Sequence, residues 1–305
     1  MVYHEIRIKN GKKQNYLVYN SRENGKWIKK NKFLGYGDIS KKKIKELKRK
    51  FELELITNIN SSNLTQKQII EIEALKQTYT QNLKKLSKEE FKIFERSFFT
   101  ELTYDSNAIE GSSLSLEDTN LIINEGLVPK GKTLREISEA KNHIEAINFI
   151  NAYKGDLNEN FILGLHSIIL KNISENFAGR YRKSSVRIFG SNAGFPDASK
   201  VPQLVKNLLY WYKLNKNKLH PFELAVVFSN KLVSVHPFID GNGRVSRLIM
   251  NFLLKKKNYP WINIYMKQRF EYLKTVRQAN NKNYKPILIF CIKILKENLK
   301  EFNLS

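Results

Sequence analysis

Cysteine is almost missing from this sequence, and its scarcity excludes several kinds of site. Cys291 is the only cysteine among 305 residues, so neither an internal disulfide nor a cysteine-rich metal site can form. The five histidines are scattered and show no spacing typical of zinc ligands. Because Cys291 lies in an apolar run, residues 287–292, we expect it to be a small core residue.

Long hydrophobic runs are also missing. A membrane-spanning helix needs roughly 18 to 20 apolar residues in succession, and the nearest candidate, residues 287–292, is ended by Lys293. The first five residues, MVYHE, do not include the apolar segment of a signal peptide. The sequence therefore indicates a protein of the reducing cytoplasm without a membrane partner.

Acidic residues are scarce relative to basic ones. The chain has 29 Asp and Glu against 53 Lys and Arg, a formal net charge of +24. Residues 1–50 contain 16 basic and 4 acidic residues, so half of the excess charge lies in about a sixth of the chain. Such a segment attracts polyanions, namely nucleic acid, anionic lipid or an acidic protein. The alternative is a solvated basic surface without a partner.

The first 58 residues are predicted to form a small β-rich module. Apolar and polar residues alternate over residues 2–36 around two turn signals, Asn10-Gly11 and Asn24-Gly25. This pattern predicts a three-stranded antiparallel meander, followed by a helix over residues 40–56. Basic and aromatic residues are interleaved in this module, as they are in many nucleic-acid-binding proteins.

The rest of the chain is predicted to be a helical domain. Residues 58–63 are polar and rich in Ser and Asn, which indicates a linker to a second domain, residues 64–305. Ser87 and Glu90 have the spacing of a capping box, and Pro286 is expected to break the last helical stretch. Periodicity predicts helices at 65–86, 87–109, 115–125, 133–153, 158–171, 201–216, 221–235, 243–256 and 266–302.

One stretch of this domain is not helical in pattern. Residues 186–198 contain a short apolar run followed by glycine and proline, which indicates a hairpin or flap. The predicted fold is therefore mainly α, a helical bundle with a β-hairpin flap, preceded by the small β-rich module.

The segment HPFIDGNGRVSR, residues 236–247, has the residue types of a phosphate-transfer site. An apolar helix delivers His236, a turn with two glycines follows, and a new helix begins. Glycines let backbone N–H groups converge on an anion, and a helix N-terminus adds partial positive charge. Arg244 and Arg247 share a helix face and can bind phosphate. Asp240 is an oxygen ligand suited to Mg²⁺, and histidine is a base near neutral pH.

This segment also resembles the signature of the Fic family, HPFx[DE]GNGRxxR, at every fixed position. The resemblance implies an enzyme that uses Mg²⁺ and ATP to attach AMP to a hydroxyl group of a protein, with pyrophosphate as the leaving group. It implies that His236 is the general base, that Asp240 holds Mg²⁺ and that Arg247 reaches the γ-phosphate. The other positions implied to bind phosphate are Gly241, Asn242, Gly243 and Arg244. The alternative is a helical corner with a buried histidine and surface arginines.

Residues 98–111 resemble the inhibitory helix of the same family, [ST]xxxE[GN]. The matching residues are Ser106, Glu110 and Gly111. Ser106 and Glu110 are four residues apart and so share one face of a helix. The resemblance implies that Glu110 pairs with Arg247 and blocks productive seating of the γ-phosphate. Because the segment precedes the signature, the chain resembles the class with an N-terminal inhibitory helix.

Two further regions carry the resemblance. Residues 179–202 resemble the flap, which would add a strand of the target to its own edge. The flap residues implied to bind the target are Val186, Arg187, Ile188 and Phe189; an ordinary surface hairpin is the alternative. Tyr272 and Asn280 lie where the family contacts adenine, although Leu273 replaces a second tyrosine that is frequent there.

Three functions stay open. The first is AMP transfer, restrained by Glu110, to a Ser, Thr or Tyr hydroxyl of a target protein or of the chain itself. The second is removal of AMP, with Glu110 positioning a hydrolytic water. The third is a nucleic-acid-binding regulator that acts through residues 1–58. The resemblance also implies a homodimer.

Overall fold

The computed structural model describes residues 2–23, 26–57, 61–186 and 194–302. The chain divides into two compact units, Met1–Glu71 with Asn217–His220, and Ile72–Lys216 with Pro221–Ser305. The division falls inside a helix, α2 (Gln66–Leu83). The linker expected at residues 58–63 therefore stays a prediction.

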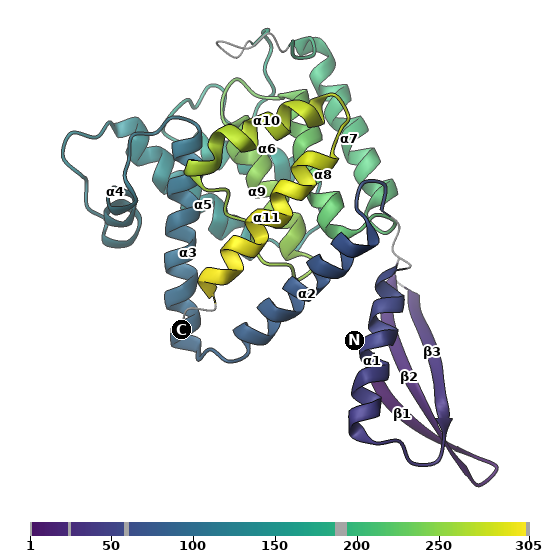
Figure 1. The fold of residues 1–305 in the computed structure, drawn as a ribbon. Coiled ribbons are helices and arrows are strands. Elements are labelled where there is room, and N and C mark those ends of the chain that lie inside the picture. The colour runs from purple at the N-terminus through teal and green to yellow at the C-terminus, as the bar shows by residue number, and fades with distance from the viewer. Residues whose placement is uncertain (1, 24–25, 58–60, 187–193, 303–305) are drawn as a thin grey trace. The chain divides into compact units, whose positions relative to one another are not determined.

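The first unit begins with three antiparallel strands, β1 (Val2–Lys9), β2 (Lys12–Glu23) and β3 (Lys26–Tyr36), in that order across the sheet (Figure 1). Between β1 and β2, Asn10 and Gly11 have φ of 53° and 70°, the left-handed pair that a two-residue hairpin requires. A bulge between Asn15 and Tyr16 shifts the register of β2 against β3. The predicted meander is confirmed.

Helix α1 (Lys41–Thr57) covers one face of this sheet. Leu47, Phe51 and Leu55 recur every four residues and so form one apolar stripe. The stripe packs on Val2 and Leu17 of the sheet, which are buried beneath it. This small core holds the first unit together.

The second unit is built almost entirely of helices (Figure 1). Helix α3 (Lys88–Ile109) begins with the predicted capping box, in which Ser87 Oγ accepts from the Glu90 N–H and the Glu90 carboxylate accepts from the Ser87 N–H. The longer helices that follow are α5 (Leu134–Ala152), α6 (Glu159–Ile169), α7 (Val201–Asn215), α8 (Pro221–Val235), α9 (Asn242–Lys255), α10 (Arg269–Asn280) and α11 (Lys285–Phe302). The mainly α fold is confirmed.

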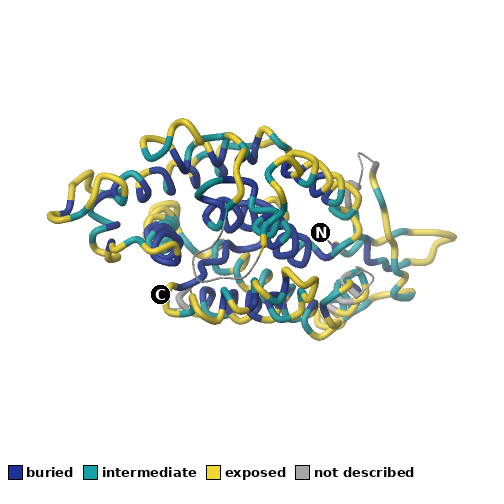
Figure 2. The backbone as a smooth tube through the Cα atoms, turned by 90° about the horizontal axis from the view of Figure 1, so that it is seen from above, coloured by how far each residue is buried: buried dark blue, intermediate teal, exposed yellow. Residues whose placement is uncertain are grey.

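Helices α8 and α9 form the centre of this unit. Residues 222–230 of α8 are all buried, and so is most of α9. Helix α9 packs on α8 and also contacts α3, α5 and α6. Figure 2 shows buried segments gathered in the interior of the helical part, with exposed residues around them. Helix α9 is therefore held by four neighbouring helices.

Two helical stretches differ from expectation. The single helix expected over 115–125 is a short α4 (Leu116–Asn120) followed by one π-helical turn, Leu121–Glu125. The stretch over 266–302 consists of a 3-10 turn (Met266–Gln268), α10 and α11, with the break at residues 281–284. Pro286 is the second residue of α11, where its missing N–H costs nothing. The proline begins a helix rather than interrupting one.

The expected flap is described only at its ends. Val186 has no regular secondary structure, while Arg187, Ile188 and Phe189 lie outside the described residues. On the far side, Asp197 caps a 3-10 turn, Ala198–Lys200, that leads into α7.

Two expectations that came from scarce residues can be compared with the structure. Cys291 is buried in α11, as expected of a core residue, and burial raises the pKa of its thiol to about 12. Among the helices that the structure describes, none combines the length and apolar character needed to cross a membrane.

Candidate active site

The loop between α8 and α9 is shaped by backbone conformations that favour small residues. His236 follows α8 with φ of 49°, and Gly241 precedes α9 with φ of 78°. A Cβ atom built on Gly241 would lie 3.2 Å from Ile169 Cγ2, so a larger residue would be strained by its backbone conformation and would require the Ile169 side chain to shift. The Asn242 side chain closes the loop by bonding the N–H and the carbonyl of Phe238 at 3.0 and 2.9 Å. The glycine turn and the start of α9 are thereby fixed together.

His236 lies in a confined place beside this turn. Its ring stacks on Phe195 with 3.9 Å between ring centroids, and its backbone carbonyl accepts a hydrogen bond from Arg182 Nε at 2.7 Å. Burial lowers the pKa of His236 to about 4, and the charge of Arg182 acts in the same direction. The imidazole is therefore neutral at pH 7 and able to accept a proton.

Arg182 is a residue whose importance the sequence analysis missed. Its guanidinium is buried and donates to the carbonyls of His236, Ser184 and Pro196 at 2.7, 3.0 and 2.5 Å. Its backbone N–H donates to the Pro237 carbonyl at 3.0 Å. It joins the histidine loop to both described ends of the flap region. The sequence indicated only that residues 179–182 belong to the region resembling the flap, and nothing distinguished Arg182 from its neighbours.

His166 was also missed, because a lone histidine on an apolar helix is usually a core residue. It is fully buried in α6 and stacks on Phe238, with 3.6 Å between ring centroids. The Gly179 N–H donates to its Nδ1 at 3.0 Å, which leaves Nε2 to donate to the Asp240 carbonyl at 3.1 Å. Burial lowers its pKa to about 4, so the ring stays neutral. His166 fixes the backbone of the glycine turn.

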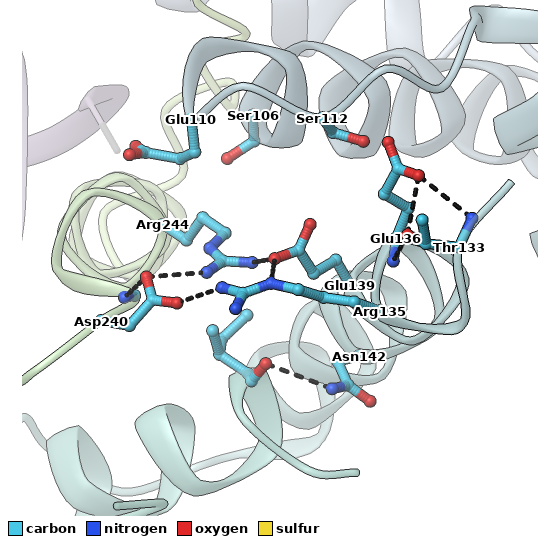
Figure 3. A network of polar contacts seen from close by, with 12 residues as sticks. Ser106, Glu110, Ser112, Thr133, Arg135, Glu136, Glu139, Asn142, Asp240 and Arg244 are labelled. Carbon is cyan, nitrogen blue, oxygen red and sulfur yellow. Dashed lines mark hydrogen bonds and ion pairs between the residues drawn. The ribbon is translucent and has the colours of Figure 1, made fainter. Parts of the chain in front are cut away.

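Asp240 belongs to a network of alternating charges (Figure 3). Its Oδ2 lies 2.5 Å from Arg135 Nη2, and its Oδ1 lies 3.2 Å from Arg244 Nη2. Glu139 Oε1 accepts from Arg135 Nε at 3.1 Å and lies 3.2 Å from Arg244 Nη1. Arg244, which the resemblance placed on the triphosphate, is buried between these two carboxylates. Arg135 lies 105 residues before Asp240, and no local pattern in the sequence indicated it.

The surroundings of Asp240 are compatible with a magnesium ion. Burial acts to raise the pKa of Asp240, but the charges of Arg244 and Arg135 and a hydrogen bond from the Gly241 N–H hold it below its usual value. Its side chain is 39% exposed, so the charged carboxylate can be reached from solvent. The described residues contain no group of three or more potential metal ligands. A single carboxylate, that of Asp240, fits Mg²⁺, which commonly takes one or two carboxylates and completes its shell with phosphate and water.

Arg247 is buried one helical turn further along α9 and is engaged by α3. Its Nη2 lies 2.8 Å from Glu110 Oε1 and donates to the Ser106 carbonyl at 2.9 Å, while its Nε donates to Ser106 Oγ at 3.2 Å. Burial acts to lower the pKa of Arg247, but the Glu110 charge outweighs it and raises the pKa. A Cβ atom built on Gly243 would overlap Glu110 Oε1, so this carboxylate lies directly over the first turn of α9. The pairing of Glu110 with Arg247 is the one that the resemblance implies.

A pocket of about 170 Å³ adjoins these residues. His236, Gly243, Arg247 and Glu110 line one side, and one face of α10 lines the other. The residues from α10 are Tyr272, Leu273, Val276, Arg277 and Asn280. Of the predicted site residues, this pocket brings together His236, Gly243, Arg247, Glu110, Tyr272 and Asn280, whereas Asp240, Gly241, Asn242, Arg244 and Ser106 are not among its lining residues. Gly111 follows α3 with φ of 107°.

Comparison with known proteins agrees with this geometry. Residues 156–254 match the model of the Fic/DOC family. The chain is 31% identical over 205 residues to the protein adenylyltransferase Fic of Nematostella vectensis, covering 65% of this chain and 47% of that protein. It is 32% identical over 191 residues to the Drosophila grimshawi protein of the same name, covering 61% of this chain and 39% of that protein. The chain therefore spans less than half the length of these relatives.

Solved structures resemble the fold over a longer range. A Fic-domain-containing signaling protein from Bacteroides thetaiotaomicron superposes with a TM-score of 0.70 at 26% identity, covering 76% of this chain and 95% of that one. Fic-1 from C. elegans superposes with a TM-score of 0.67 at 24% identity, covering 87% of this chain and 78% of that one. The match to the Fic/DOC family over residues 156–254 includes the loop that carries His236.

Proposed function

We propose that the chain transfers AMP from ATP to a hydroxyl group of a protein. The observation that carries this proposal is the convergence of His236, the N-terminus of α9 and Arg247 on one pocket. A neutral base, an anion-binding turn and a buried cation are the parts that transfer of a nucleotide phosphoryl group requires. The activity in the names of the N. vectensis and D. grimshawi relatives agrees with this chemistry.

In this reaction His236 takes the proton of the attacking hydroxyl. The hydroxyl oxygen forms a bond to the α-phosphorus of ATP, the bond from that phosphorus to the bridging oxygen breaks, and pyrophosphate leaves. The role requires a neutral ring, and burial keeps His236 neutral before the reaction. Its contacts with Phe195 and Arg182 orient the ring before substrate arrives.

The turn and the arginines would bind the phosphates. Backbone N–H groups at Gly241, Asn242 and Gly243 lie at the start of α9, where anions are favoured. Asp240 would hold Mg²⁺, which neutralises phosphate charge when it is bound. Arg247 would pair with the γ-phosphate, while Arg244 acts through Asp240, whose carboxylate it contacts.

The adenine would occupy the α10 side of the pocket. Leu273 and Val276 offer apolar side chains to the flat base, and Asn280 offers an amide. The Asn280 amide lies 2.6 Å from Ser234 Oγ, so one end of the amide is engaged and the other can form a hydrogen bond with a ring nitrogen. The Tyr272 ring is buried, so it supports the wall beside Arg247.

Glu110 would restrain the reaction. Its carboxylate occupies Arg247 and overlies Gly243, the two places that the γ-phosphate and its neighbours would need. A phosphate near this carboxylate would be repelled, so ATP could bind only in a displaced position. The partner is a protein that presents a Ser, Thr or Tyr hydroxyl, the chain itself, or a second copy in a homodimer.

Removal of AMP is the second candidate, and one observation favours it. Glu110 lines the same pocket as His236 and contributes to its electrostatics. A carboxylate in that place could hold a water molecule for attack on a phosphodiester. Glu110→Gln would keep the size of the side chain but remove the base, so it should abolish removal of AMP from a modified target.

The test compares wild type, Glu110→Gly and Glu110→Gly/His236→Ala with ATP labelled at the α-phosphate and Mg²⁺, with and without cell lysate. We expect label on protein from Glu110→Gly at roughly 5- to 150-fold the wild-type level, the range of typical coupling energies. The double variant should return to background. Bound nucleotide without label in every variant would contradict AMP transfer, and equal label in wild type and Glu110→Gly would contradict restraint by Glu110.

A further inference from the structure

The face of the N-terminal sheet opposite α1 carries a row of aromatic side chains. The register places Tyr3, Tyr16 and Phe33 on neighbouring strands of this face, because Tyr16 is paired with Phe33 and the rings of these two lie 5.2 Å apart. Trp27 is six residues from Phe33 on β3 and so shares its face. The helix-side core contains none of these four residues.

These rings are unusually open to solvent. Trp27 is 72% exposed, Tyr36 62%, Phe33 45% and Tyr3 39%. Tyr36 is paired with Gln14 and packs edge-on against Phe33, with 5.1 Å between centroids. Large aromatic side chains are more often buried, so several exposed on one face of a sheet mark a candidate binding surface.

Basic side chains lie among these rings. Arg7 stacks over the Tyr16 ring at 4.2 Å, and Lys29 lies on the same face of β3. Lys9 and Lys12 face each other at the exposed end of the first hairpin. The one carboxylate of the face, Glu5, lies 2.7 Å from Arg7 and 3.7 Å from Lys29, which lower its pKa. The face is therefore positively charged despite this acid.

We propose that the exposed aromatic and basic side chains of this face bind nucleic acid, with the rings stacking on bases and the cations contacting phosphates. A flat sheet with aromatic rings on adjacent strands, about 4.8 Å apart, suits planar bases. The balance of 16 basic against 4 acidic residues in the first 50 supplies long-range attraction to a polyanion. An acidic protein could pair with the basic side chains, but it would offer the aromatic rings no planar group on which to stack. The proposal is independent of AMP transfer.

The test uses the full chain without ATP. A labelled oligonucleotide of about 16 nucleotides, single-stranded or annealed to its complement, is titrated while fluorescence anisotropy is followed from about 50 to 200 mM salt. We expect binding that weakens with salt. Trp27→Ala/Phe33→Ala should weaken it about tenfold or more at constant salt, because stacking contributes strongly for each base. Lys9→Gln/Lys12→Gln should reduce the salt slope by about 1 to 2.

The matched controls lie in the helical unit. Tyr210→Ala/Phe270→Ala removes two rings that are 64% and 81% exposed, and Lys206→Gln/Lys213→Gln removes two exposed charges from α7. Both should bind as wild type, and thermal unfolding checks that every variant is folded. The single strand should bind more tightly than the duplex, because its bases are free to stack on the rings.

Three results would overturn the proposal. The first is no binding to either oligonucleotide at the lowest salt. The second is equal loss of affinity in the sheet variants and their controls. The third is binding to anionic phospholipid vesicles that depends on Trp27 and Phe33, with no binding to oligonucleotide.

Discussion

Among the single residues, Arg247 is contacted from two other helical segments. Ser106 and Glu110 bond it from α3, and Tyr272 contacts it from α10. A buried guanidinium without partners is strongly destabilising. The site must therefore always provide an anion or hydrogen-bond acceptors for Arg247, and a phosphate can take the place of Glu110 without leaving the charge unpaired.

Replacing Ser106 tests this view of Arg247. Ser106→Ala removes a hydroxyl that accepts from Nε and Nη2, while the Ser106 carbonyl remains. We expect the free energy of unfolding to fall by about 1 to 2 kcal/mol, and AMP transfer to rise less than in Glu110→Gly. Urea unfolding and the labelled-ATP assay measure the two effects. Transfer equal to that of Glu110→Gly would mean that Ser106, rather than the carboxylate, maintains the restraint.

His166 offers a second test at this scale. His166→Phe keeps a ring that can stack on Phe238 but removes the partners of the Asp240 carbonyl and the Gly179 N–H. Leaving these groups unpaired should cost about 1 to 3 kcal/mol each. We expect AMP transfer in the Glu110→Gly background to fall through kcat, with ATP affinity changed less. A folded variant with unchanged kcat would show that the turn holds its shape without His166.

The sequence could predict the residues of the loop but not everything that orients them. His236, Asp240 and Arg247 lie in one contiguous segment, so a local pattern was enough. Arg135 and Arg182 reach this segment from 105 and 54 residues away, through tertiary contacts that no spacing records. An arginine that caps backbone carbonyls has no sequence signature, since its partners can be residues of any type.

Among the elements, α3 connects the periphery of the bundle to the site. Its N-terminus is fixed by the Ser87 capping box, and its last turn carries Ser106 and Glu110. The helix is 22 residues long, so its two ends should respond to mutation differently. One end contributes only stability, and the other contributes stability and restraint.

A pair of variants separates the two ends. Ser87→Ala removes the cap and should cost about 0.5 to 2 kcal/mol without changing AMP transfer. Gly111→Ala places a side chain at φ of 107°, where nothing lies within 4 Å, so the backbone itself must change. We expect that change to displace Glu110 and raise transfer. Unfolding and transfer are measured together; a rise in transfer with Ser87→Ala would show that general loosening, rather than the end of α3, controls the restraint.

Element prediction from sequence was accurate where one signal dominated. Asn10-Gly11 specified a hairpin, and Ser87 with Glu90 specified a helix start. The prediction was less accurate over 115–125, where α4 is followed by a π-helical turn. The two kinds of turn share a similar hydrophobic pattern and differ in which carbonyl each N–H reaches. The four-residue gap between α10 and α11 likewise left no clear signal apart from Pro286.

For the whole molecule, three histidines whose pKa values are lowered predict acid sensitivity. The pKa values of His143, His166 and His236 are lowered by burial to about 3, 4 and 4, whereas the unfolded value is near 6.5. Below pH 6.5 these histidines bind protons in the unfolded chain but stay neutral in the folded chain until the pH approaches 4. Their contribution to stability is therefore complete above that pH and is lost as the pH falls toward 4.

Each of these histidines should cost about 1.4 kcal/mol per pH unit in that window. Carboxylates with lowered pKa, such as Glu136 at about 2, act in the same direction but below pH 4. Urea unfolding at pH 7, 6 and 5 should show falling stability, with a slope smaller by about one proton in His166→Phe. Stability that is flat from pH 7 to 5 would mean that these rings are protonated in the folded protein.

Arg182 joins the His236 loop to both described ends of the flap region. One guanidinium holds the carbonyls of Ser184 and Pro196 together with that of His236. The stretch of chain that leaves at Ser184 and returns at Pro196 thus begins and ends at fixed anchors beside the base. Apart from Phe195, whose ring stacks on the imidazole, residues between these anchors can be substituted while both anchors stay in place. Sequence change in most of this segment is thereby uncoupled from the geometry of the loop that carries His236.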